Sequence, residues 1–271
     1  MKDSKCRRDA ASGRIAFVIL AIAALAASSC GGPYTPKRLS VAADKLALAD
    51  RLFDRGSYRG AAAEYKDFGA TFAGDERSDY AQFRLAESYR LDEEYSLAEV
   101  EYRILINDYG YSEFVDDAFF LEAVCGFRQS PRYERDQTKS LQSLDRLNRF
   151  VQMFPSSPRL EEARAMIREV QEKLGRKDFA SAKLYYSKKR YDASLVYLRK
   201  IIEMYPETVW AARSRFYRAA IAETKGDAAG AIEDYRSVLA SRDAIPEKQD
   251  AEKRLRSLER KAEGTRNADG G

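Results

Sequence analysis

The chain has 271 residues, 45% of them hydrophobic and 33% charged, with a formal net charge of +4 at neutral pH. Glycine and proline are sparse, at 15 and 7 residues, which favours helical structure over disorder. Histidine is absent, which excludes histidine-based catalytic triads, metal sites and pH switches. Three cysteines are too few for a disulfide framework or the usual metal cluster.

The first 29 residues have the pattern of a secretory signal: a basic start, the uncharged run Ile15–Ala27, and then small residues. As a helix this run is only about 20 Å long, too short to cross a bilayer comfortably. The sequence A-S-S-C, which ends at Cys30, resembles a bacterial lipoprotein processing site, although Ala27 makes the motif a loose one. We expect Cys30 to be lipidated and to anchor the protein to a membrane; a plain signal peptide with an incidental cysteine is the alternative.

The basic character of the chain belongs mainly to this leader. Residues 1–29 contain five basic and two acidic side chains, so their removal lowers the net charge from +4 to +1. A nearly neutral mature chain is not expected to bind nucleic acid.

A small residue followed four positions later by a large one occurs five times in the mature chain. Further apolar residues follow seven and usually eleven positions after the small one, so each segment has one apolar helix face. The five pairs are Ala61 and Tyr65, Ala98 and Tyr102, Ser143 and Leu147, Ser194 and Leu198, and Ala231 and Tyr235. Proline or glycine behind the segment ends the helix.

A partner helix with its own small residue precedes each of these segments. The five small residues are Ala49, Ala86, Ala123, Ala182 and Ala219. Large apolar residues three positions away flank them, as Leu46 and Leu52 flank Ala49. A small residue lets two helices approach closely while its large neighbours fill the surrounding space, so the sequence predicts five helix pairs.

The spacing of these positions reveals two inserts. The alanines of the first helices are 37, 37, 59 and 37 residues apart, and the small residues of the second helices are 37, 45, 51 and 37 apart. The 22 extra residues therefore divide into eight around 129–136 and fourteen around 159–174. The second insert has apolar residues at helical spacing, so we expect it to lengthen the first helix of repeat four, with Gly175 as the candidate position of a kink.

Together these features form the tetratricopeptide pattern and predict an all-α solenoid of about five helix pairs, with a generic helical bundle as the alternative. Repeat five fits least well, because Arg218 stands where leucine is expected. A charged last helix, 246–262, is predicted to cap the solenoid. The expected divisions are a signal peptide (1–29), a lipidated linker (30–38), repeats one and two (39–112), repeat three with its insert (113–158), the long helix with repeats four and five (159–241), and a capping helix with a loose tail (242–271).

No set of residues in the sequence is suited to catalysis or to holding a metal or cofactor, so we expect a binding protein without enzymatic activity. Paired carboxylates such as Glu93-Glu94 are explained by solvated helix faces and helix N-termini. The enzyme alternative is a carboxylate protein acting on peptidoglycan, which would need two carboxylates converging in a deep pocket.

The position within each repeat predicts which side chains face the concave surface. Residues one and four positions after the small residue of the first helix are expected to point inward. In repeats one to three these positions, with Tyr80 six before Ala86 and Arg128 beside Phe127 added, give the candidates for a peptide-binding groove. They are Phe53, Tyr80, Glu87, Arg90, Phe127 and Arg128. Such a groove would suit an extended, aromatic-rich peptide with a terminal carboxylate, although each aromatic residue could instead pack against neighbouring repeats.

Two stretches carry a resemblance to a known family. One comprises R-D-Q-T-K-S-L-Q-S-L at 135–144 and R-F-V-Q-M-F-P-S-S-P-R-L-E-E-A at 149–163. The other comprises A-S-A-K-L-Y-Y-S-K-K-R-Y-D-A-S at 180–194 and I-I-E-M-Y-P-E-T at 201–208. With the lipoprotein leader and the two inserts, the chain over about Leu39–Leu239 resembles the BamD family, the lipoprotein subunits of the outer-membrane β-barrel assembly machine.

The resemblance implies a non-enzymatic protein, lipid-anchored on the periplasmic face of the outer membrane. It implies that the C-terminal repeats dock on the periplasmic domain of the barrel-forming subunit, and that the N-terminal repeats receive the C-terminal signals of unfolded outer-membrane proteins. The candidate docking residues here are Lys183, Tyr186, Tyr197 and Arg199. Family members often carry arginine where this chain has Tyr197, and Arg199 lies on a different helix face, which puts the usual docking contacts in doubt.

Two other binding proteins fit part of the pattern. A tetratricopeptide lipoprotein that assists pilus or secretin assembly would share the anchor and the solenoid but not these inserts. A soluble periplasmic coordinator of cell division would require an unmodified Cys30.

Overall fold

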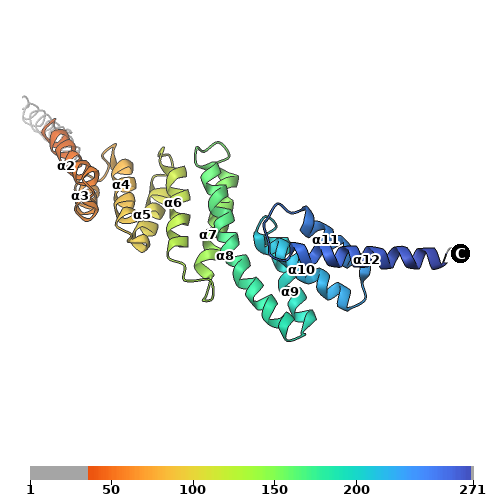
Figure 1. The fold of residues 1–271 in the computed structure, drawn as a ribbon. Helices are drawn as coiled ribbons and strands as arrows, with labels where there is room; N and C mark the ends of the chain where they lie inside the picture. The colour runs from red at the N-terminus through yellow and green to blue at the C-terminus, as the bar shows by residue number, and fades with distance from the viewer. Residues whose placement is uncertain (1–35, 270–271) are drawn as a thin grey trace, which may run out of the picture. The chain divides into compact units, whose positions relative to one another are not determined.

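The computed structural model describes residues 36–269, which form eleven α-helices and no β-strand. The chain divides into two compact units, Met1–Asp44 and Lys45–Gly271, and the small residues of all five predicted helix pairs lie in the second unit. In chain order (Figure 1) the helices are α2 (Pro36–Asp54), α3 (Tyr58–Thr71), α4 (Ser78–Leu91), α5 (Tyr95–Asp108), α6 (Val115–Arg128), α7 (Thr138–Met153), α8 (Leu160–Ser187), α9 (Tyr191–Met204), α10 (Val209–Thr224), α11 (Ala228–Ala240) and α12 (Lys248–Asp269).

From α3 onward, each helix packs against the next one along the chain. The first helices of neighbouring repeats also touch, α6 against α8 and α8 against α10. This sequential packing of helix pairs confirms the predicted all-α solenoid of tetratricopeptide-like repeats.

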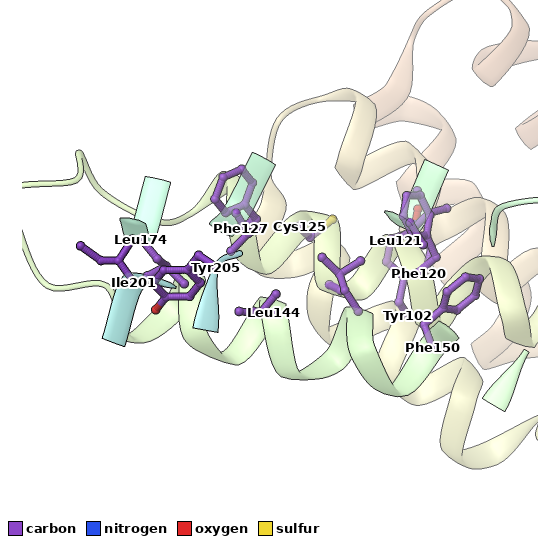
Figure 2. Packing of buried hydrophobic residues seen from close by; sticks show 14 of the residues in the cluster. Tyr102, Phe120, Leu121, Cys125, Phe127, Leu144, Phe150, Leu174, Ile201 and Tyr205 are labelled. Carbon is purple, nitrogen blue, oxygen red and sulfur yellow. The ribbon is translucent and has the colours of Figure 1, made fainter. Parts of the chain in front are cut away.

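The residues that set the repeat register form the core. All ten small positions of the five helix pairs are at most 1% exposed, as are the five large residues that follow in the second helices. Figure 2 shows Tyr102, Phe150 and Ile201, from three successive second helices, within one core cluster. Cys125 lies in the same cluster, where burial raises the pKa of its thiol to about 12, so it is a core residue as expected.

In repeats three and four the small residue of the second helix is serine rather than alanine, and its hydroxyl has a specific partner. Ser143 donates to the carbonyl of Ala123 at 2.7 Å, and Ser194 donates to the carbonyl of Ala182 at 2.9 Å. Each bond joins the two small residues of one repeat. Serine is therefore tolerated in this fully buried place because its polar group is satisfied.

The large residue of the second helix is tyrosine in repeats one, two and five, and each tyrosine hydroxyl donates to a carboxylate of the preceding helix. The pairs are Tyr65 with Asp50 (2.6 Å), Tyr102 with Glu87, and Tyr235 with Glu223 (3.2 Å). Repeats three and four carry leucine instead and have no acidic residue at the matching first-helix positions. These acidic residues are therefore structural partners of buried hydroxyl groups.

In repeats one, two, four and five, the turn between the two helices has one residue with left-handed backbone, seven positions after the first-helix alanine. Glycine supplies it in repeats one and five, where φ is +75° at Gly56 and +82° at Gly226. Glu93 and Lys189 adopt the same conformation, with φ of +62° and +57°. A side chain with a Cβ atom is disfavoured there by roughly 1 kcal/mol.

Replacing Lys189 by glycine is therefore expected to raise the free energy of unfolding by about 0.5–1 kcal/mol, because the Cβ penalty disappears. Urea unfolding of the purified chain measures this change. Glycine at the neighbouring Lys188, whose φ is −84°, is the matched control and should destabilise slightly. Equal effects at both positions would show that the left-handed conformation costs nothing here.

The second insert is part of one long helix. α8 has 28 residues and runs without interruption through Gly175, so this glycine does not end or break the helix. A Cβ atom at Gly175 would lie 3.1 Å from Cδ1 of Trp210. The glycine is needed because the Trp210 ring packs directly against the backbone of α8.

The last helix is longer than predicted. α12 continues to Asp269, so residues 263–269 are helical rather than a loose tail. The segment contains no proline, so no residue in it prevents the helical hydrogen bonds from continuing. Ala251, Leu255 and Leu258 are buried with residues of α10 and α11, so one face of this charged helix closes the core.

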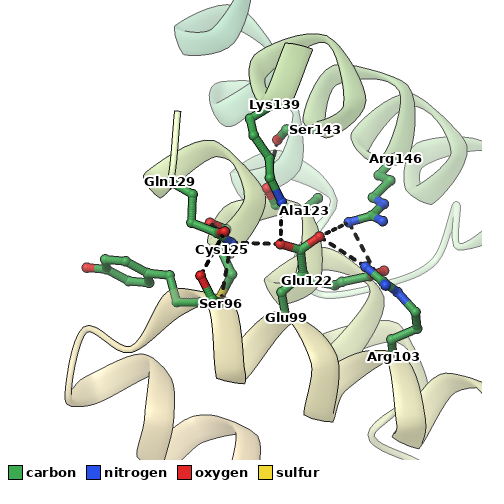
Figure 3. A network of polar contacts seen from close by, with 11 residues as sticks. Ser96, Glu99, Arg103, Glu122, Ala123, Cys125, Gln129, Lys139, Ser143 and Arg146 are labelled. Atoms are coloured by element: carbon green, nitrogen blue, oxygen red, sulfur yellow. Dashed lines mark hydrogen bonds and ion pairs between the residues drawn. The ribbon is translucent and has the colours of Figure 1, made fainter. Parts of the chain in front are cut away.

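A buried polar network joins repeats two and three (Figure 3). Glu99 of α5 and Glu122 of α6 are only 7% and 5% exposed. Arg103 bridges them at 3.0 and 2.9 Å, and Arg146 bridges them again at 2.9 and 3.2 Å. Lys139 and the side-chain amide of Gln129 also bind Glu99, at 3.0 and 2.7 Å. Burial opposes the ionisation of Glu99, but the hydrogen bonds from Lys139, Gln129 and Arg146 outweigh it and lower its pKa to about 2.

Arg218, which departs from the repeat pattern, has a partner in α11. Its guanidinium forms two hydrogen bonds, at 2.7 and 2.6 Å, with the carboxylate of Asp234, a residue that is 6% exposed. Arg218 and Asp234 occupy the same repeat positions as Glu122 and Arg146 in repeat three, with the charges exchanged. Repeat five thus replaces an apolar contact with a partly buried ion pair.

Candidate functional site

The structure brings together two of the predicted groove residues, Phe53 and Tyr80, through an arginine that the sequence did not single out. The guanidinium carbon of Arg84 lies 3.6 Å from the centre of the Phe53 ring and 5.8 Å from that of Tyr80. Both aromatic residues are partly exposed. Arg84 forms an ion pair with the exposed Asp54, at 3.6 Å. This arrangement presents a cation between two aromatic rings.

Asp50 fixes one side of this cluster. Its Oδ1 atom accepts hydrogen bonds from the hydroxyl groups of Tyr65 at 2.6 Å and Tyr80 at 2.9 Å. Burial raises the pKa of Tyr80, as does its hydrogen bond to Asp50. Tyr80 is therefore oriented before any ligand arrives, and its ring also lies 6.0 Å from that of Phe114.

Glu87 and Arg90 are engaged with each other. The guanidinium of Arg90 donates two hydrogen bonds to the carboxylate of Glu87, at 2.7 and 2.8 Å, and Tyr102 donates a third. Burial opposes the ionisation of Glu87, but the bonds from Arg90 and Tyr102 keep its pKa below the usual value. The predicted cationic rim at Arg90 is thus neutralised by its own helix.

Phe127 and Arg128 have different surroundings. Phe127 is 7% exposed and belongs to the main core cluster, with the ammonium of Lys173 4.9 Å from its ring centre. Arg128, the last residue of α6, is exposed. Of the two, only Arg128 offers appreciable surface to a ligand.

The candidate docking residues of repeat four form two groups. Tyr186 packs edge-on against Tyr217, with ring centres 5.0 Å apart, and the ammonium of Lys183 lies 5.6 Å from the same ring. Tyr197 stacks on Tyr185 instead, at 5.7 Å and an interplanar angle of 14°. Arg199 is exposed and lines a pocket of about 370 Å³ between α9, α10 and α11, together with Arg218 and Lys225.

The proposed lipidation site, Cys30, and the leader 1–29 lie outside the described residues. Over residues 36–269, none of the helices is both long and apolar enough to cross a membrane. The same range contains no group of three or more carboxylate or cysteine side chains placed to hold a metal ion. What the described surfaces offer is aromatic rings, cations and carboxylates suited to binding polypeptide.

Sequence reasoning missed Arg84 because it considered the positions one and four after each alanine, with Tyr80 and Arg128 added, and Arg84 lies two positions before Ala86. A usable signal existed in the tyrosines. Tyr65 and Tyr102 each follow an acidic residue by fifteen positions, which identifies Asp50 and Glu87 as hydroxyl acceptors rather than free groove residues.

The helix pairs, their buried small residues and their left-handed turns define a tetratricopeptide-like repeat protein with partly exposed aromatic and cationic clusters. A family model described as YfiO, outer membrane lipoprotein, matches residues 46–236, and the chain belongs to this BamD-like family, as the sequence resemblance indicated. A relative from Caulobacter vibrioides, named outer membrane protein assembly factor BamD, is 26% identical over 160 residues, covering 59% of this chain and 52% of the relative. The chain thus spans about half the length of the curated relative it matches.

Proposed function

We propose that this protein is a non-enzymatic, lipid-anchored scaffold of the machinery that assembles β-barrel proteins into the outer membrane. In this proposal residues 1–29 are a signal peptide, Cys30 carries the lipid, and the repeats lie on the periplasmic face. The C-terminal repeats dock on the periplasmic domain of the barrel-forming subunit. The N-terminal repeats receive the C-termini of unfolded outer-membrane proteins.

The observation that carries this proposal is the extent of the family match. Residues 46–236 include nearly all of the five helix pairs and both inserts. The relative named as an assembly factor supports the same role. The described surfaces add aromatic and charged groups of the kind that bind peptide segments.

The decisive experiment is a pull-down of the full-length protein from detergent-solubilised envelope, followed by mass spectrometry. Recovery of a barrel protein with soluble periplasmic domains, in near-equal amount, is the expected result. Recovery of secretin or pilus components instead would contradict the proposed role in β-barrel assembly but not the solenoid fold.

Replacing Cys30 by alanine is expected to release the protein from the membrane fraction, because the lipid has no other attachment point in this proposal. Fractionation with immunoblotting measures the shift, and mass spectrometry of the wild-type N-terminus should detect the acyl chains. Alanine at the buried Cys125 is the control and should leave the protein with the membrane. A Cys30 variant that stays membrane-bound contradicts the anchor.

The groove proposal is centred on Arg84 rather than on Arg90. Arg84 lies over Phe53 and donates to the Tyr65 hydroxyl at 3.3 Å, and within residues 36–269 its one ion-pair partner is the exposed Asp54. It can therefore pair with a peptide carboxylate, whereas Arg90 is held by Glu87. A peptide whose last side chain is aromatic would place that ring near Phe53 and Tyr80.

Replacing Arg84 by glutamine is expected to weaken binding of a ten-residue peptide ending in a free phenylalanine carboxylate by about tenfold, and to leave its C-terminal amide unaffected. Fluorescence anisotropy with the two labelled peptides measures both affinities. Glutamine at Arg59, which is 81% exposed and pairs with Asp92, is the control for charge alone. Equal weakening of the acid and the amide would assign Arg84 a purely structural role.

A further inference from the structure

The two inserts meet and border an open pocket that the repeat pattern does not predict. Its volume is about 440 Å³. The loop of residues 129–137 forms one wall, α8 forms another, and the start of α10 completes it. The lining residues are Arg132, Tyr133, Glu172, Lys173, Arg176 and Trp210.

The loop is held against α8 by lysine side chains. Lys173 donates to the hydroxyl of Ser130 at 2.5 Å and to its carbonyl at 3.3 Å, while Lys177 donates to the carbonyl of Arg135 at 2.6 Å. These bonds position the loop with neutral oxygen atoms rather than carboxylates. The positive charge of the lysines is therefore retained at the contact.

Two cations of the pocket form no ion pair with a carboxylate of the described part of the chain. Lys173 has Ser130 and the ring of Phe127 beside it, and the Arg176 guanidinium lies 4.1 Å from the centre of the Tyr133 ring. Burial lowers the pKa of Lys173, which means that its charge is incompletely solvated. Inside the described part of the chain this charge is offset only by the longer-range attraction of Glu169, so a ligand anion at contact distance would stabilise it.

The single carboxylate that lines the pocket already accepts a hydrogen bond from the chain. Glu172 accepts a hydrogen bond from the backbone N–H of Val209 at 2.9 Å and so binds the N-terminus of α10. Arg132 adds a third cation and is 86% exposed at its side chain, with Glu134 at 3.8 Å. The lining residues thus carry three positive charges and one negative charge, beside the positive end of a helix dipole.

The rest of the lining is aromatic. Trp210 is partly exposed, and its ring packs against the backbone of α8 at Gly175. The ring of Tyr133 contacts the guanidinium of Arg176. Preformed aromatic walls beside unpaired cations fit a ligand that offers an anion next to an apolar group.

We propose that this pocket is a docking site for an acidic segment of a partner protein, in which an aspartate or glutamate side chain is flanked by apolar residues. The carboxylate lies between Lys173 and Arg176, and an apolar neighbour packs on Trp210 and Tyr133. The site goes beyond the function proposed above, because it is a second binding surface and does not depend on the groove near Phe53 or on the identity of the assembly machine.

The sequence offers a convenient probe, since Trp210 is the only tryptophan of the chain and its fluorescence reports on this pocket. We would titrate the full chain with acetyl-Gly-Leu-Glu-Phe-Glu-Leu-Gly-amide and with the peptide in which both glutamates are glutamine. Both peptides lack a free terminal carboxylate, so they do not test the proposed groove. The acidic peptide is expected to shift the Trp210 emission saturably and to bind at least tenfold more tightly than the glutamine peptide.

The double variant Lys173→Gln/Arg176→Gln should remove this preference, because both unpaired charges are lost while a donor to Ser130 remains. Arg168→Gln, an exposed arginine of the same helix, is the matched control and should bind as the wild type does. Circular dichroism and thermal unfolding establish that each variant folds.

Three results would overturn the proposal. Equal binding of the two peptides would show that only apolar contact matters. No change in Trp210 emission with either peptide would show that the pocket is not a peptide site. A shift with phosphatidylglycerol vesicles but not with the acidic peptide would assign the pocket to a lipid surface.

Discussion

Replacing Glu99 by glutamine is expected to lower the free energy of unfolding by about 3 kcal/mol, because a buried charge pair is broken on one side. Glutamine keeps the shape of the side chain but leaves Arg103 and Arg146 with Glu122 alone, and it removes the carboxylate that pairs with Lys139. Urea unfolding followed by circular dichroism measures the loss.

The control residue, Asp145, lies on α7 and lines the same surface pocket as Glu99 and Arg146. Asp145 pairs with Arg149 at 3.1 Å, but both side chains are more than 60% exposed, so Asp145→Asn should change stability by less than about 1 kcal/mol. Equal effects of the two substitutions would show that burial does not increase the contribution of the Glu99 network to the free energy of unfolding.

The acid dependence provides a second measurement of the same network. The pKa of Glu99 is lowered from 4.5 to about 2, so its carboxylate stabilises the fold fully above pH 4.5 and loses that effect as the pH falls toward 2. The difference in stability between the wild type and Glu99→Gln should therefore be constant above pH 4.5 and shrink below it. A difference that persists unchanged at pH 2 would contradict the proposed role of the ionised carboxylate.

The sequence was sufficient for the fold because each repeat carries its own register. Ala49, Ala86 and Ala182 are fully buried where the spacing predicts, and the long helix α8 follows from apolar residues at helical spacing. Gly175 does not interrupt that helix, and the residue that requires glycine there is Trp210, 35 positions later in another helix. Periodicity describes one helix at a time and does not specify which side chain arrives from a neighbour.

The candidate site was harder to predict for the same reason. Glu87 and Arg90 have the expected positions, but whether they face a ligand depends on Tyr102, which comes from the next helix. Arg84 does not follow the positional rule, although it contacts both Phe53 and Tyr80. A rule that pairs each buried tyrosine with an acidic residue about fifteen positions earlier would have separated structural carboxylates from free ones in repeats one and two.

Exchanging the charges of Arg218 and Asp234 should restore stability that either single change removes. Repeat three already contains the exchanged arrangement, with Glu122 on its first helix and Arg146 on its second, 3.2 Å apart. Asp234→Arg alone places two arginines against each other at a partly buried site and is expected to cost about 2–3 kcal/mol, as is Arg218→Glu, because solvent screens the one-third-exposed Arg218.

The double variant Arg218→Glu/Asp234→Arg should recover at least half of the summed losses, because the ion pair forms again with reversed polarity. A double-mutant cycle from urea unfolding of the four proteins measures the coupling. Strictly additive losses would show that the Arg218–Asp234 pair contributes no coupling energy. The pair would then not replace the contact that leucine makes at this position in the repeat pattern. A large coupling would mean that the same two repeat positions accept an ion pair of either polarity, so a search for such repeats should treat these positions as a correlated pair.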